Sequence, residues 1–105
     1  MKIIETAIFT KKINSLLTDE EYRNLQNELI LNPEKGKVIR GSGGLRKIRW
    51  GLPGRGKSGG VRIIYYWILK RNTILMLLAY SKNEQDNLTP LQLRTLKSLV
   101  EKELQ

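Results

Sequence analysis

The sequence predicts an α+β fold: a small, twisted, mostly antiparallel sheet with two N-terminal helices packed on it and a helix at the C-terminus. Three observations lead to this prediction. Apolar residues recur at helical spacing near both ends of the chain, two strand-like runs follow each other at 61–69 and 73–80, and all nine glycines lie between 36 and 60. A chain of 105 residues can bury one modest core. We therefore predict a single domain over residues 1–105.

The N-terminal part is expected to form a strand and two helices. Residues 2–9 are rich in Ile and Thr and predict a strand, and a short helical stretch follows it through Leu17. Thr18 stands three residues before a glutamate, which is the capping-box pattern that opens a helix. That helix should end near Leu31, because Pro33 cannot continue its hydrogen bonds and restricts the residue before it.

The remaining elements complete a sheet of three to five strands. A short strand is predicted over residues 45–50. Alternation along it places Leu45, Lys47 and Arg49 on one face and Arg46, Ile48 and Trp50 on the other. The runs at 61–69 and 73–80, joined by a turn at 70–72, predict a central antiparallel hairpin. Thr89 followed by Pro90 predicts the start of the last helix.

Composition excludes several classes of chemistry. The chain has no cysteine, which removes disulfides and thiolate sites, and no histidine, the commonest metal ligand and neutral-pH acid or base. We expect no metal and no cofactor. The N-terminus lacks the pattern of a signal peptide, and no apolar run approaches the ~20 residues that cross a bilayer. The sequence therefore predicts a cytoplasmic protein without a membrane partner.

Charge is segregated along the chain. From Lys35 to Asn83 there are twelve Lys or Arg residues and no Asp or Glu, although Glu34 and Glu84 flank this block. The block carries +12 and the rest of the chain −3, which together give the net +9. A segregated basic surface on a small domain is typical of proteins that bind a phosphate backbone.

The first candidate site lies on the predicted sheet. Arg46, Lys47 and Arg49 share a strand, and Arg62 opens the next one. If these strands are neighbours, their cations gather with little counter-charge, as in sites that bind phosphate oxygens. The alternative is a solvated edge strand, which charged side chains protect from aggregation.

A second candidate is the glycine-rich loop at 51–60. Its spacing satisfies the count of a phosphate-binding P-loop, but Lys57 and Ser58 lead into a strand, whereas that motif requires a helix. We interpret the segment as a basic hairpin loop in which Arg55 and Lys57 contact a nucleic-acid backbone. A plain flexible turn is the alternative.

A third candidate is the end of the second hairpin strand, where Tyr80 is followed by Lys82. Catalytic groups often stand where a rigid strand passes into a loop, although an ordinary solvated strand end has the same pattern. Tyr80 belongs to a set of aromatic residues interleaved with the cations. Such rings stack on bases or, more commonly, pack in the core.

Taken in order, these segments resemble toxins of the RelE/ParE superfamily of toxin–antitoxin systems, with most similarity to the HigB-type branch. The resemblance covers nearly the full chain and rests on five stretches: 41–49, 54–60, 61–66, 80–84 and 88–89. It implies a RelE-like fold and a ribosome-dependent mRNA endonuclease that is silenced by a cognate antitoxin of helix-turn-helix type. It also implies metal-independent cleavage, in which the ribose 2′-hydroxyl attacks the adjacent phosphate.

The resemblance also suggests roles for individual residues. Lys47 and Arg49 match the paired cations of the family, and Arg62 matches the arginine that opens the next strand, so we assign transition-state charge to Arg62 and proton transfer to Lys47 or Lys82. Two positions depart from the RelE branch. Asn83 replaces an arginine and Thr89 replaces a catalytic tyrosine. Tyr80 and Lys57 are candidates to supply the missing groups.

Two other functions fit the sequence. A ParE-like gyrase poison has the same fold and a different target, and a non-enzymatic RNA-binding module has the same basic surface. The convergence of Lys47, Arg49, Arg62 and Lys82 favours the endonuclease, because gyrase inhibition does not obviously require it.

Overall fold

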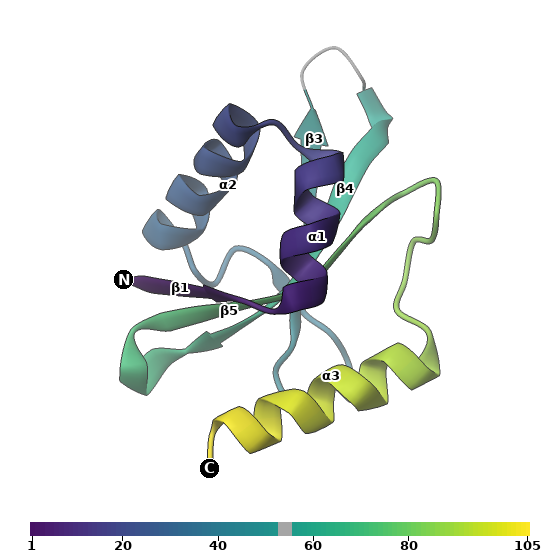
Figure 1. The fold of residues 1–105 in the computed structure, drawn as a ribbon. Helices are drawn as coiled ribbons and strands as arrows, with labels where there is room; N and C mark the ends of the chain where they lie inside the picture. Colours follow the sequence, from purple (N-terminus) through teal and green to yellow (C-terminus); the bar gives the residue numbers. More distant parts are fainter. Residues whose placement is uncertain (53–55) are drawn as a thin grey trace.

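The computed structural model describes residues 1–52 and 56–105, and in these it contains one five-stranded sheet and three α-helices (Figure 1). The elements are β1 (Lys2–Glu5), α1 (Ala7–Leu16), α2 (Asp19–Leu31), β2 (Lys37–Val38), β3 (Arg46–Leu52), β4 (Gly56–Ile68), a 3₁₀ turn (Leu69–Arg71), β5 (Thr73–Ser81) and α3 (Pro90–Glu103). The strand order is β1-β5-β4-β3-β2, with β1 parallel to β5 and the other pairs antiparallel. The predicted α+β fold is confirmed.

The two faces of the sheet are covered by different helices. Phe9 and Ile13 of α1 and Leu25 and Leu29 of α2 pack against one face in a single buried cluster. Leu96 and Val100 of α3 belong to a second cluster on the other face. Figure 1 shows α3 lying apart from α1 and α2. Helices therefore pack on both faces of the sheet.

The predicted N-terminal strand is wrong beyond Glu5. The side chain of Thr6 accepts a hydrogen bond from the backbone N–H of Phe9, so the chain turns into α1 four residues before the predicted strand end. Phe9 and Ile13, spaced four apart, then face the core while Ile8 remains exposed. A cap followed by helical spacing outweighs the β-propensity of Ile and Thr.

The other helix boundaries follow the predicted capping signals. Thr18 and Glu21 form a complete capping box at the start of α2, and Asn32 ends that helix. Thr89 caps α3, with Pro90 in its first turn, and Gln92 completes a second capping box. The short strand β2 was not predicted, because two residues carry no alternation pattern.

The central hairpin is confirmed, and its strands are longer than predicted. Asn72 adopts the left-handed conformation, with φ of 49°, and closes the turn between β4 and β5. β3 continues to Leu52 and β4 begins at Gly56, so most of the predicted glycine-rich loop is strand. The register between β3 and β4 shifts between Trp50 and Leu52, and the regular pairing before this shift, from Arg46 to Trp50, positions the candidate site.

Candidate active site

Three predicted site residues form a row across the sheet. Arg49 of β3 pairs with Arg62 of β4, and Arg62 pairs with Tyr80 of β5. Lys47 lies two residues before Arg49 and therefore projects from the same face. This is the face covered by α3, since Leu45 and Tyr80 belong to the buried cluster that includes Leu96. The prediction that Lys47, Arg49 and Arg62 share a face is confirmed.

The loop that joins β5 to α3, residues 82–89, supplies a group that sequence reasoning missed. The Nε atom of Arg62 donates a hydrogen bond to Oδ1 of Asp86 at 3.1 Å, and Nη2 of Arg62 lies 3.0 Å from the same oxygen. The main-chain carbonyl of Asp86 accepts hydrogen bonds from the Tyr80 hydroxyl at 3.1 Å and from Nζ of Lys47 at 3.3 Å. Nζ of Lys47 also donates to Oδ1 of Asn87 at 2.7 Å. Residues 86 and 87 thus contact the side chains of Lys47, Arg62 and Tyr80.

Asp86 stands three residues beyond the acid-free block in the sequence. The fold nevertheless brings its carboxylate into contact with Arg62, a cation of that block. The one feature of the sequence that could have indicated a role for Asp86 is its proximity to Lys82, a predicted site residue. Contacts that span 24 and 39 residues depend on strand pairing and on the path of the loop, which a residue pattern does not show.

Burial and charge set the protonation behaviour of the site. The side chain of Arg62 is 6% exposed, whereas that of Asp86 is 51% exposed. The hydrogen bond from Arg62 holds the pKa of the Asp86 carboxyl below its ordinary value, with help from the charges of Lys47 and Arg49. Desolvation lowers the pKa of Lys47, as do the neighbouring arginines, while Asp86 acts in the opposite direction. Burial raises the pKa of Tyr80.

Next to this group lies a cavity of about 450 Å³. Its lining consists of Arg49, Trp50, Gly51, Gly60, Arg62 and Lys82. Cations from β3, β4 and the start of the β5–α3 loop therefore converge on one hollow, of a size that accepts a small ligand. Guanidinium and ammonium groups in such an arrangement bind phosphoryl oxygens.

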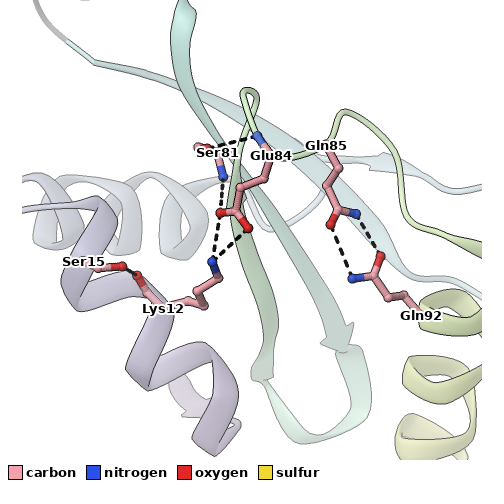
Figure 2. A network of polar contacts seen from close by, with 6 residues as sticks. All are labelled: Lys12, Ser15, Ser81, Glu84, Gln85 and Gln92. Atoms are coloured by element: carbon pink, nitrogen blue, oxygen red, sulfur yellow. Dashed lines mark hydrogen bonds and ion pairs between the residues drawn. The ribbon is translucent and has the colours of Figure 1, made fainter.

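The β5–α3 loop is braced from two sides, as Figure 2 shows. Nζ of Lys12, in α1, lies 2.9 and 3.0 Å from the two carboxylate oxygens of Glu84. Gln85 and Gln92, in α3, exchange side-chain hydrogen bonds of 2.8 and 3.4 Å. Glu84 also accepts a 3.5 Å hydrogen bond from the backbone of Ser81. These contacts hold the segment that carries Asp86 against the sheet.

The remaining predicted residues lie elsewhere or are buried. Arg46 projects from the opposite face, where its Nη1 donates to the carbonyls of Glu34 and Gly36 at 3.0 and 2.7 Å. Tyr80 is 1% exposed, which leaves no ring face for a stacked base, so its contribution to the site is its hydroxyl.

Two further predicted residues follow β3 in the sequence, Arg55 and Lys57. Arg55 lies outside the described residues, and for Lys57 only the backbone, within β4, is described. Their predicted contacts with nucleic acid stay predictions. In the described part of the chain, no helix is long and apolar enough to span a membrane.

Comparison with known proteins identifies the family. The family model described as RelE toxin of the RelE/RelB toxin–antitoxin system matches residues 1–105. The protein is thus of the class of toxins that occur in toxin–antitoxin pairs. Within that class, the chain belongs to the RelE toxin family. The superfamily resemblance predicted from the sequence is confirmed, and the assignment to the HigB-type branch stays a prediction.

Solved structures share the fold. The intact E. coli RelBE toxin–antitoxin complex contains a chain with a TM-score of 0.59 and 18% identity, over 76% of this chain and 94% of that one. An arginine-to-alanine double mutant of the E. coli toxin RelE in the free state has a TM-score of 0.57 and 17% identity, over 80% of this chain and 85% of that one. At this identity the likeness concerns the arrangement of helices and strands.

Proposed function

We propose that this toxin is a ribosome-dependent mRNA endonuclease that cuts translated message and thereby inhibits translation. The observation that carries the proposal is the convergence of Arg49, Arg62 and Lys82 on one cavity, with Lys47 beside it. This arrangement supplies both a phosphate-binding surface and a group able to transfer a proton. Membership of the RelE family supports the same reading.

The proposed reaction needs only side chains. The ribose 2′-oxygen attacks the adjacent phosphorus, and the bond from phosphorus to the 5′-oxygen of the next nucleotide breaks. Arg62 and Arg49 stabilise the charge that develops on the phosphoryl oxygens. Lys47, whose pKa is lowered by desolvation and by its cationic neighbours, gives its proton to the departing 5′-oxygen. The products are a 2′,3′-cyclic phosphate and a 5′-hydroxyl.

The test is cleavage in a bacterial translation extract, with message ends mapped by primer extension. Wild-type protein should produce new ends within translated regions. Arg62→Ala should reduce cleavage by about 10²–10³-fold, because it removes a donor to the transition state. Arg23→Ala, at an exposed position of α2, is the charge-matched control and should cleave normally. Intact message after translation has stopped would contradict the proposal.

Two further measurements separate the alternative functions. A gyrase poison would cause DNA breaks on induction and leave message intact. A binding module would retain RNA with an affinity that falls steeply with salt, without cutting it.

An antitoxin is the expected protein partner, in keeping with the toxin–antitoxin system for which the family is described. We propose that it is of helix-turn-helix type and that acidic residues on it cover the basic surface around Arg49 and Lys82. Because ribosomes and message are the proposed targets, the toxin would act in the cytoplasm. Co-expression with the neighbouring open reading frame should restore growth.

A further inference from the structure

Asp86 brings a carboxylate into a group of cations, and the proposed reaction leaves the proton of the 2′-hydroxyl without an acceptor. We propose that Asp86 is the general base that takes this proton, with Lys47 as the matching acid. The inference rests on the proposed endonuclease function and adds a residue and a role to it.

The two carboxylate oxygens of Asp86 have different surroundings. Oδ1 accepts the contacts from Nε and Nη2 of Arg62. For Oδ2 there is no hydrogen bond to any residue in the described ranges 1–52 and 56–105. The side chain is half exposed while Arg62 beneath it is buried. One oxygen therefore fixes the carboxylate, and the other is open to a ligand that approaches from solvent.

The main chain of Asp86 is fixed as well. Its carbonyl accepts from Tyr80 and Lys47, which ties the loop to β5 and β3. The residues immediately before it are held by the Lys12–Glu84 ion pair and the Gln85–Gln92 hydrogen bonds (Figure 2). A catalytic group needs this kind of support, because its rotamer and position must be set before the substrate arrives.

The proposed base contacts both the proposed acid and a proposed phosphate-binding residue. Arg62 contacts the side chain of Asp86, and Lys47 contacts its main chain. As the bond from O2′ to phosphorus forms, the 2′-proton passes to Oδ2 of Asp86. As the bond from phosphorus to O5′ breaks, the Lys47 ammonium gives a proton to O5′. Asp86 ends protonated and Lys47 neutral, and exchange with water restores both.

Asp86 also holds Arg62, so a test has to separate a proton acceptor from a positioning residue. Asp86→Asn does this, because the amide oxygen still accepts a hydrogen bond from Arg62 but cannot take up a proton. Asp86→Glu keeps a carboxylate and should retain part of the activity. Glu101→Gln, an exposed change on α3, is the control for loss of one negative charge.

The experiment uses a short synthetic message on programmed ribosomes, made with either oxygen or sulfur at the 5′-bridging position of the cleaved linkage. A thiolate leaves without the help of an acid, because thiols have far lower pKa values than alcohols. Lys47→Ala should therefore be slow on the oxygen substrate and recover on the sulfur substrate. Asp86→Asn should be slower than wild type by about 10²–10³-fold on both, since the 2′-hydroxyl still needs a base.

The rate against pH gives a second readout. Because Arg62 lowers the pKa of the Asp86 carboxyl, wild-type cleavage should fall only below the ordinary aspartate range, and the residual cleavage of Asp86→Asn should lack this acidic limb. Recovery of Asp86→Asn on the sulfur substrate, an unchanged acidic limb or a loss of threefold or less would overturn the inference and leave the endonuclease proposal intact. Failure of the wild type to cut the oxygen substrate would overturn both. Thermal unfolding of each variant checks whether the fold is retained.

Discussion

Arg49 and Arg62 stand directly opposite each other on the antiparallel strands β3 and β4. Both side chains project from the same face, and like charges at paired positions repel each other. Asp86 offsets part of this repulsion through its ion pair with Arg62. An arrangement that costs stability in this way is typical of functional sites, where binding a charged ligand outweighs the loss.

Replacing one member of this pair should stabilise the free protein. We expect Arg49→Gln to raise the free energy of unfolding by ~0.2–1 kcal/mol, because the repulsion from Arg62 is removed. Cleavage should fall at the same time, because a ligand for the phosphate is lost. Urea unfolding and the translation extract measure the two effects. Arg23→Gln should change neither, and a less stable Arg49→Gln protein would contradict the prediction.

The activity should fall at alkaline pH. Desolvation and the neighbouring arginines lower the pKa of Lys47, and an ammonium donates its proton only below its pKa. The alkaline limb of the cleavage rate should therefore lie below the ordinary lysine range. Asp86 raises the pKa of Lys47, so Asp86→Asn should shift this limb to still lower pH. Titration of the Lys47 Nζ resonance by NMR checks the assignment, and a signal that titrates at the ordinary lysine value would contradict it.

The ion pair with Arg62 should contribute to stability in a limited range of pH. Because the pKa of Asp86 is lower in the folded than in the unfolded chain, the contribution is present above the unfolded value of about 3.9. It is lost as the pH falls through the lower, folded value. Asp86→Asn should therefore lose less stability on acidification than wild type. Urea unfolding over a pH series measures this difference, and parallel curves for the two proteins would argue against it.

The Lys12–Glu84 ion pair should matter more for the loop than for the fold. Its side chains are 37% and 43% exposed, and ion pairs this open contribute only ~0.2–1 kcal/mol. We expect Lys12→Ala to leave global unfolding nearly unchanged but to speed hydrogen exchange of the amides at 82–88 and to slow cleavage. Lys11→Ala, the exposed neighbour, is the matched control. Unaltered hydrogen exchange in the loop would show that the ion pair does not stabilise the loop conformation.

Gly36 should tolerate no side chain. A Cβ atom at this position would lie 2.7 Å from Cε1 and 2.8 Å from the hydroxyl of Tyr65. That buried hydroxyl accepts from the backbone N–H of Gly36 and donates to the carbonyl of Pro33. We expect Gly36→Ala to destabilise the fold by ~1–3 kcal/mol, as overpacking does. Thermal unfolding measures this, and Gly51→Ala, where a Cβ has open space, should have little effect.

Sequence patterns were most informative for features that depend on interactions between residues close together in the chain. Thr18 and Thr89 marked helix starts correctly, because a cap and its partner lie within three residues of each other. The strand prediction through Phe9 was wrong for a related reason. Thr6 is a capping residue, and the β-propensity of its neighbours concealed that role.

In the candidate site, too, local features could be predicted from the sequence and long-range contacts could not. Alternation along β3 was enough to place Lys47 beside Arg49, since neighbouring positions on one face depend only on the strand itself. The gathering of Arg49 and Arg62 was predicted on the condition that their strands are neighbours, and the strand order meets that condition; the direct pairing of the two residues was not predicted. The separation of Arg46 from this group also follows from alternation, but its contacts with Glu34 and Gly36 do not.

By itself, the sequence determined the fold class, the basic character of one surface and the absence of histidine and cysteine from the chemistry. These follow from composition, capping and periodicity, which are properties of short segments. Only the tertiary structure decided that Asp86 enters the cation group, that Tyr80 is buried and that α1 and α3 both hold the β5–α3 loop. Each of these depends on contacts between segments far apart in the chain, and strand register and helix packing bring such segments together.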